Sequence, residues 1–222
     1  MKAQLSVWGL QMELAWEDAA ANTAAVDAWM ADRPAGADVL VLPEMWATGF
    51  TMRPTSCGDR GDALAAMQRW AASADALVCG SLSVIAPDGA CYNRHYAVEP
   101  SGAWTAYDKR HTFSFAGEDA HYAAGTERVV VSWRGRNLLL QTCYDARFPV
   151  FSRNRADAPY DGMIYVANWP AVRVDAWATL IRAPPQALSV PFQRFPVNRF
   201  ATAGIDQDRS GLHGFQFLIS HQ

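Results

Sequence analysis

The sequence has no hydrophobic run long enough to cross a membrane. A spanning helix needs about 20 consecutive apolar residues, and no run approaches that length although half of the 222 residues are hydrophobic. The segment Met1 to Trp8 also lacks the apolar core of a signal peptide. We therefore expect a cytoplasmic protein without a membrane partner.

Cysteine is scarce, and its spacing excludes the common metal and redox motifs. The four cysteines are Cys57, Cys79, Cys91 and Cys143, and none of their spacings fits a zinc site or a CxxC redox pair. We therefore expect neither a zinc site nor a redox cysteine pair. Cys79 and Cys91 lie in apolar, strand-like segments, where cysteine behaves as a small hydrophobic residue, and Cys57 lies in a polar, loop-like segment.

Positive charge is not concentrated anywhere along the sequence. The chain has 19 Lys and Arg against 22 Asp and Glu, a formal net charge of −3, and its basic residues are scattered singly. A nucleic-acid interface needs clustered basic residues that neutralise phosphates, so we expect no nucleic-acid partner. No Gly/Ser-rich, Pro-rich or charged linker occurs before about residue 183, which favours one domain.

Strand-like and helix-like segments alternate along the chain. The apolar runs predict strands at 3–8, 38–42, 77–84, 93–98, 104–107, 128–133, 137–142 and 162–167. Helical spacing predicts helices at 16–30, 62–74 and 174–181, with a short one after Pro149. This alternation favours an α/β fold with helices covering sheet faces. Ligand sites in such folds gather where strands end.

Three reactive side chains follow predicted strands. Glu44 comes directly after a buried strand, where loss of solvent would raise the carboxylate pKa toward that of a general base. Lys109 could hold an oxyanion. Cys143 lies between a strand and a helix start, as in a nucleophile elbow, where main-chain N–H groups favour a thiolate. Each residue alone is more often a surface glutamate, a surface lysine or a buried structural cysteine.

Together these segments resemble the nitrilase, or carbon–nitrogen hydrolase, superfamily. The three motifs are Leu42-Pro-Glu44, Asp108-Lys-Arg-His111 and Cys143-Tyr-Asp-Ala-Arg-Phe-Pro149, and they occur in the order and spacing of that superfamily. The likeness covers about residues 3–183. Within the superfamily the chain is most similar to bacterial omega-amidases, which resemble 2-oxoglutaramate amidase. This closer likeness rests on Met45, Thr48-Gly-Phe50, the Lys109-Arg-His triplet and Asn168-Trp-Pro170.

The resemblance implies both a fold and a reaction. The fold is a four-layer αββα sandwich, without metal or dissociable cofactor, that assembles as a homodimer. The reaction is hydrolysis of the terminal amide of a small carboxylate-bearing substrate, such as 2-oxoglutaramate, through a cysteine thioester with release of ammonia. A nitrile hydrolase and an amidase for deaminated glutathione share the same triad, and both alternatives stay open.

The resemblance also implies residue roles. Glu44 is the expected general base, Lys109 the oxyanion donor and Cys143 the nucleophile. Glu118 matches a second glutamate that orients Lys109 or the substrate. The residues expected to contact substrate are Glu118, Tyr144, Phe113, Trp169 and Arg147, with Phe50 as a further pocket wall. Arg173 and Arg110 are alternatives to Arg147 for a substrate carboxylate, and Asp145 is expected to pair with Arg147.

The likeness fails after Ala183. We expect residues 1–183 to form the carbon–nitrogen hydrolase domain and residues 184–222 a divergent segment of that domain. Pro184 and Pro185 would break a helix that continues in the family, and a family-like fragment resumes at Val197-Asn-Arg199. A reading-frame slip is one hypothesis for this ending. It predicts an incomplete sandwich with an uncovered sheet edge, so an inactive nitrilase-like chain is the alternative function.

Overall fold

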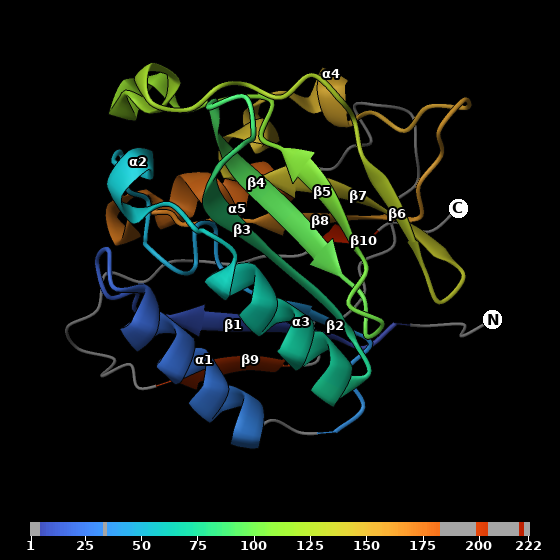
Figure 1. The fold of residues 1–222 in the computed structure, drawn as a ribbon. Helices are drawn as coiled ribbons and strands as arrows, with labels where there is room; N and C mark the ends of the chain where they lie inside the picture. Colours follow the sequence, from blue (N-terminus) through green and yellow to red (C-terminus); the bar gives the residue numbers. More distant parts are fainter. Residues whose placement is uncertain (1–4, 33–34, 183–198, 204–217, 220–222) are drawn as a thin grey trace.

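Two β-sheets stack face to face in the computed structural model (Figure 1), which describes residues 5–32, 35–182, 199–203 and 218–219. The first sheet has the strand order β5-β4-β3-β2-β1-β9, and the second has the order β10-β8-β7-β6. The strands β1, β2, β3 and β9 run parallel, whereas β4 and β5 are antiparallel to their neighbours. None of the helices in these residue ranges is long and apolar enough to cross a membrane.

The elements follow the predicted alternation closely. The strands are β1 (Val7–Met12), β2 (Val39–Val41), β3 (Leu77–Ile85), β4 (Cys91–Val98), β5 (Trp104–Asp108), β6 (Val130–Trp133), β7 (Arg136–Thr142), β8 (Gly162–Val166), β9 (Arg199–Ala203) and β10 (Leu218–Ile219). The α-helices are α1 (Ala19–Asp32), α2 (Pro54–Cys57), α3 (Asp62–Ala74), α4 (Pro149–Ser152) and α5 (Val174–Arg182). Short 3-10 helices are η1 (Ser114–Ala116), η2 (Glu118–Ala120), η3 (Cys143–Arg147) and η4 (Ala171–Arg173).

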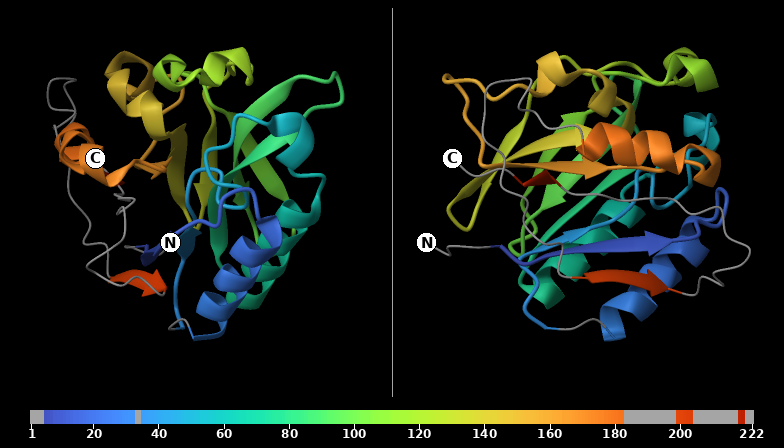
Figure 2. Two further views of the ribbon diagram at one scale, coloured as in Figure 1. Left: turned by 90° about the vertical axis from the view of Figure 1, so that its left-hand side faces the viewer. Right: turned by 180° about the vertical axis from the view of Figure 1, so that it is seen from behind.

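The sheets and helices form four layers, as the resemblance implies. Helices α1 and α3 cover the outer face of the first sheet, and α5 covers the outer face of the second (Figure 2). Three hydrophobic clusters fill the three spaces between the layers. The predicted αββα sandwich is therefore confirmed.

Alternation of side chains along each strand explains why the buried strands read as continuous apolar runs. In β2, Val39 and Val41 point into the cluster between the sheets, whereas Leu40 points toward the helices α1 and α3. In β8, Ile164 packs between the sheets and Tyr165 packs toward α5. Because successive side chains face opposite sides of a sheet, a strand with both faces covered needs apolar residues at every position.

The first strand differs from its prediction. We expected residues 3–8, but β1 begins at Val7 and continues to Met12. Residues 1–4 lie outside the described residues. The strand begins at Val7 because that residue pairs with Val39 of β2. It continues to Met12 because its other edge pairs with β9 from Trp8 to Met12. The pairing with β9 joins segments far apart in the sequence.

The C-terminal part also differs from its prediction. Strand β9 starts at Arg199, where the family-like fragment was recognised, and it covers the edge of β1. The edge of β1 is therefore not the uncovered sheet edge that the frame-slip hypothesis predicts. Helix α5 ends at Arg182, and the predicted disruption by Pro184 and Pro185 lies outside the described residues. Cys57, expected in a loop, ends the one-turn helix α2.

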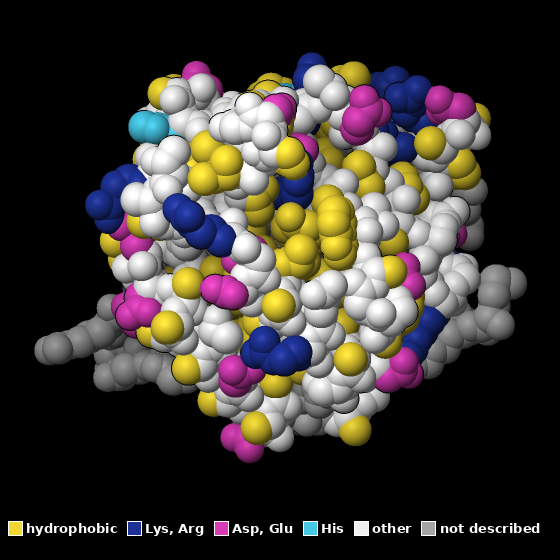
Figure 3. All heavy atoms as spheres, viewed as in Figure 1, with side chains coloured by type: hydrophobic (Ala, Val, Ile, Leu, Met, Phe, Trp, Pro, Cys, Tyr) yellow, Lys and Arg dark blue, Asp and Glu magenta, His cyan; other side chains and the backbone are white. Residues whose placement is uncertain are grey.

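Charged side chains are mixed on the face of the molecule that carries α1 and α3. Figure 3 shows acidic and basic groups interspersed there, with no extended region of one sign. This arrangement fits a chain with 19 basic and 22 acidic residues scattered along its length. Such a face offers no continuous basic track for a phosphate backbone.

Truncating a valine between the two sheets should destabilise the fold. Val131 is 4% exposed in the inter-sheet cluster, whereas Val150 in α4 is 74% exposed. We expect Val131→Ala to lower the free energy of unfolding by about 2 kcal/mol, because two buried methyl groups are lost and a cavity remains. The same change at Val150 should stay within about 0.5 kcal/mol. Urea denaturation of both variants measures the difference, and equal losses would contradict this location of the core.

Candidate active site

The three predicted catalytic residues meet at the ends of strands from both sheets. Glu44 follows β2 and Lys109 follows β5 in the first sheet, and Cys143 follows β7 in the second. Their exposed fractions are 0%, 1% and 8%. The structure thus brings together residues 34 to 99 positions apart in the sequence, as the strand-end argument predicted. Their catalytic roles stay a prediction.

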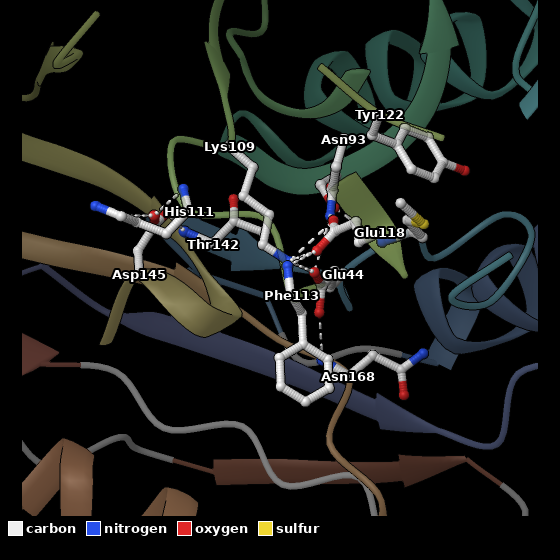
Figure 4. A network of polar contacts seen from close by, with 12 residues as sticks. Glu44, Asn93, Lys109, His111, Phe113, Glu118, Tyr122, Thr142, Asp145 and Asn168 are labelled. Carbon is white, nitrogen blue, oxygen red and sulfur yellow. Dashed lines mark hydrogen bonds and ion pairs between the residues drawn. The ribbon is translucent and has the colours of Figure 1, made fainter. Parts of the chain in front are cut away.

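Lys109 lies between two buried carboxylates (Figure 4). Its Nζ is 2.8 Å from Glu44 Oε1, 2.8 Å from Glu118 Oε2 and 3.0 Å from Glu118 Oε1. Glu118 starts η2 and is fully buried, so it contacts Lys109 rather than the pocket. No three His, Cys, Asp or Glu side chains cluster as a metal site in the described ranges. Lys109 is the cation that pairs with these two carboxylates.

Two asparagines that were not among the predicted site residues also contact this network. Asn93 in β4 donates through Nδ2 to Glu44 Oε1 at 2.8 Å and to Glu118 Oε1 at 3.0 Å. The main-chain N–H of Asn168 donates to Glu44 Oε2 at 3.1 Å. Asn168 lies within the family-like segment Asn168-Trp-Pro170, which was the signal available in the sequence. Their hydrogen bonds hold the Glu44 carboxylate in one orientation.

Burial and charge shift the pKa values of this cluster. Loss of solvent raises the pKa of Glu44 above its usual 4.5, while the neighbouring Lys109 acts in the opposite direction and Glu118 raises it further. Burial alone would lower the pKa of Lys109, but Glu44 and Glu118 together raise it above its ordinary value. Lys109 is therefore a permanent cation, and Glu44 has the elevated pKa expected of a general base.

The turn that carries Cys143 has a strained backbone. Cys143 has a φ of 45°, in the left-handed region that non-glycine residues rarely occupy. It opens η3 directly after β7. Strain of this kind persists only where surrounding contacts enforce it. The geometry supports the predicted resemblance to a nucleophile elbow.

Asp145 enforces this turn through four hydrogen bonds. Its Oδ2 accepts from the Tyr107 hydroxyl at 2.8 Å and from the Thr142 N–H at 2.9 Å. Its Oδ1 accepts from the N–H and the Nδ1 of His111, at 3.0 and 2.7 Å. The expected pairing of Asp145 with Arg147 is wrong, because these donors occupy the carboxylate and Arg147 contacts the Trp169 ring instead.

The surroundings of Cys143 favour the thiol over the thiolate. Burial raises its pKa well above 9.0, and the nearby Glu44 raises it further while Lys109 lowers it. This direction agrees with the expectation that Glu44 takes the thiol proton when Cys143 reacts. The thiol must therefore pass its proton to a base when it reacts, and Glu44 shares the pocket with it.

A small aromatic cavity opens over Cys143. Its volume is about 90 Å³, roughly the space of three liquid water molecules. The lining residues are Glu44, Phe50, Phe113, Ala116, Cys143, Tyr144, Asn168, Trp169, Pro170 and Arg173. The walls predicted at Phe50, Phe113, Tyr144 and Trp169 are all present. Such a cavity suits a short substrate chain with its reacting end toward Cys143.

The three candidate arginines separate clearly in space. Arg173 lines the cavity over Cys143. Arg147 and Arg110 instead line a second hollow beside Phe148 and Val150 of the surface near α4. Arg147 also lies 6.0 Å from the ring centroid of Trp169, a wall of the cavity over Cys143, so its expected contact with the substrate stays a prediction.

Comparison with known proteins assigns the family. Residues 6–212 match the carbon-nitrogen hydrolase family. The chain belongs to this family. It is thus a carbon–nitrogen hydrolase of the nitrilase superfamily, which agrees with its Glu-Lys-Cys cluster and its four layers.

Its relatives include omega-amidases. The chain is 47% identical to omega-amidase YafV of Yersinia enterocolitica over 175 residues, covering 78% of this chain and 67% of the relative. It is 43% identical to omega-amidase YafV of Escherichia coli K12 over 180 residues, covering 81% and 69%. The 2-oxoglutaramate amidase of Bacillus subtilis is 28% identical over 180 residues, covering 78% and 69%.

A solved structure supports the same family. XC1258 from Xanthomonas campestris, a CN-hydrolase superfamily protein, superposes with a TM-score of 0.74 and 37% identity. The match covers 78% of this chain and 68% of XC1258. An amidase from Nesterenkonia sp. shares the fold at 21% identity, with a TM-score of 0.64 and coverage of 78% and 70%.

Replacing Glu118 with an uncharged residue should shift the acid limb of the pH profile of kcat/KM. The raised pKa of Glu44 predicts that kcat/KM falls at a pH above 4.5, since protonated Glu44 cannot accept the thiol proton. Glu118 contributes to that elevation, so Glu118→Gln should move the acid limb to lower pH and also reduce the maximal rate. The exposed Glu13→Gln serves as a control. An acid limb that does not move in Glu118→Gln would contradict this coupling.

Proposed function

We propose that this chain is an omega-amidase, which hydrolyses the terminal amide of a small carboxylate-bearing substrate such as 2-oxoglutaramate and releases ammonia. The observation that carries the proposal is the buried thiol of Cys143 beside Glu44 and Lys109, at the end of a small aromatic cavity. The names of its relatives support the substrate class. The cavity volume of about 90 Å³ favours a short substrate.

Acylation begins with proton transfer to Glu44. The carboxylate takes the thiol proton of Cys143, and the sulfur attacks the amide carbonyl carbon to form a tetrahedral oxyanion. Lys109 can donate to this oxyanion, because one N–H suffices for the two Glu118 oxygens and another for Glu44. The N–H of Tyr144, in the first turn of η3, is the second donor.

The same glutamate completes acylation and then serves in deacylation. Glu44 returns its proton to the leaving nitrogen, the carbon–nitrogen bond breaks, and ammonia departs, which leaves the acyl group bound to Cys143 as a thioester. Glu44 then removes a proton from a water molecule, which attacks the thioester carbonyl. Collapse of the second tetrahedral intermediate frees the carboxylic acid product and restores the thiol with the proton held by Glu44. The hydrogen bonds from Asn93 and Asn168 keep Glu44 in place through both stages.

The expected localisation, partners and assembly of the enzyme are also part of this proposal. We expect it to act in the cytoplasm on a small-molecule amide, without nucleic-acid or membrane partners, and as a homodimer. The resemblance to the family and the mixed charges of Figure 3 support these expectations. Sedimentation of the purified protein measures the assembly.

Removing the Cys143 thiol should abolish amide hydrolysis. We expect Cys143→Ala to reduce ammonia release from 2-oxoglutaramate by at least about a thousandfold, since no other group can form the thioester. Cys79 is the matched control, because it is fully buried in the inter-sheet cluster, away from the pocket. Cys79→Ala should lower thermal stability while it retains turnover in the folded protein.

Three outcomes would overturn the proposal. Turnover by Cys143→Ala equal to that of the unchanged protein would exclude the thioester route. A folded, unchanged protein that releases no ammonia from 2-oxoglutaramate, other short amides or nitriles would support the alternative of an inactive nitrilase-like chain. Release from nitriles or from deaminated glutathione in preference to 2-oxoglutaramate would instead assign one of the other reactions of the family.

A further inference from the structure

The second hollow gathers basic side chains that lie far apart in the sequence. Its volume is about 550 Å³, and helix α4 forms part of its wall. Its lining contains no acidic residue, but it contains one histidine and four arginines, which are His111, Arg110, Arg128, Arg147 and Arg155. None of its lining residues lines the cavity over Cys143. The fold therefore builds a basic hollow that is distinct from the catalytic cavity.

Three of these arginines have no carboxylate partner in the ranges that the structure describes. Arg110 and Arg128 each donate from Nη1 to a main-chain carbonyl at 2.9 Å, and Arg147 lies against the ring of Trp169. Contacts of this kind hold a guanidinium group in place, but they leave its positive charge unpaired, because arginine stays protonated in proteins.

The fourth arginine has a partner that it can release easily. Arg155 Nη2 lies 2.7 Å from Asp157 Oδ2, and its Nε lies 3.1 Å from Asp157 Oδ1. The two side chains are 56% and 65% exposed, and an ion pair so open to solvent contributes little to stability. The remaining carboxylate nearby, Asp145, is fully buried and accepts from His111. Positive charge is therefore in excess around the hollow.

Arg128 is the arginine of this group that is least well solvated. Its Nε is buried and has no hydrogen-bond partner among the described residues. Burial lowers the pKa of Arg128 and the neighbouring Arg155 lowers it further, whereas Tyr160 and Asp157 act in the opposite direction. Neighbouring guanidinium groups repel each other. An anion that contacts both Arg128 and Arg155 would offset this repulsion.

The wall beside these arginines is packed rigidly. The rings of His111 and Phe148 stack with centroids 3.8 Å apart at an interplanar angle of 5°. Phe151 meets His111 edge-on at 5.3 Å, and His111 Nδ1 lies 2.7 Å from Asp145 Oδ1. A binding site whose wall is formed before the ligand arrives loses less conformational entropy on binding. The hollow is therefore prepared for a ligand without refolding.

We propose that the second hollow binds a small multivalent anion, whose phosphate or carboxylate oxygens pair with the guanidinium groups of Arg128 and Arg155. The guanidinium group presents parallel N–H donors that match two oxygens of either group. Several charges are expected on the ligand, because four guanidinium groups line one hollow. This site is separate from the substrate site, and the inference does not depend on the proposed amidase function.

Calorimetric titration with sodium pyrophosphate tests the proposal in the full-length protein at low ionic strength. We expect saturable binding that weakens by about tenfold or more in Arg155→Gln, the usual effect of losing a hydrogen bond between charged groups. Arg69→Gln is the matched control, because Arg69 is 59% exposed, also faces an aspartate and lies in α3 outside the hollow. Its affinity should change less than about twofold. Equal weakening in both variants, or no saturation in the unchanged protein, would overturn the proposal.

A variant with the opposite expected effect separates a specific contact from general damage. Asp157→Asn removes the exposed partner of Arg155, so it should tighten pyrophosphate binding by about twofold or more. Arg173→Met alters the arginine of the cavity over Cys143 and should leave the affinity unchanged. Loss of binding in Arg173→Met with none in Arg155→Gln would place the anion in the catalytic cavity, and the inference would be wrong.

Two further measurements identify the ligand chemistry and test a competing use of the hollow. Citrate, titrated in the same way, carries three carboxylates, so saturation by pyrophosphate alone assigns a phosphate ligand and saturation by citrate alone assigns a polycarboxylate. Sedimentation of Arg155→Gln tests whether the hollow is instead a contact between subunits. Weakened assembly together with unchanged anion binding would show such a contact and would overturn the proposal.

Discussion

The ion cluster around Lys109 is the constraint on which the rest of the site depends. A lysine that is 1% exposed survives in the protein interior only because two carboxylates surround it. Removing one partner of such a buried pair typically costs about 3–5 kcal/mol. The chain segments that carry Glu44, Lys109 and Glu118 must therefore reach the same point, and that point is where β2 and β5 end.

The stacking of the sheets delivers Cys143 to this cluster. Alternating side chains of β2 and β8 fill the space between the sheets, so the strand ends of one sheet lie over those of the other. Asp145 then links the turn after β7 to Tyr107 of β5 and to His111, which follows β5. The packing of ordinary valine and isoleucine residues thus sets the distance between the nucleophile and its base.

Sequence reasoning located Glu44, Lys109 and Cys143 because each follows an apolar strand. The family motifs then identified these three residues as a candidate catalytic triad. It could not give the partners of Asp145, since Tyr107 and Arg147 are equally plausible from chain spacing and only the three-dimensional turn decides. The same holds for Asn93 and the Asn168 N–H. The extension of β1 depends on β9, almost two hundred residues away in the chain.

The turn at Cys143 links the chemistry of this protein to its folding. Its left-handed backbone is held by Asp145, which accepts hydrogen bonds from Tyr107 in β5 of the opposite sheet and from His111 in the loop after β5. The second sheet alone therefore cannot hold the nucleophile in its reactive geometry. A partly folded chain carries an ordinary cysteine, and the reactive one exists only after the two sheets have docked. Hydrolytic competence is in this sense a late product of folding.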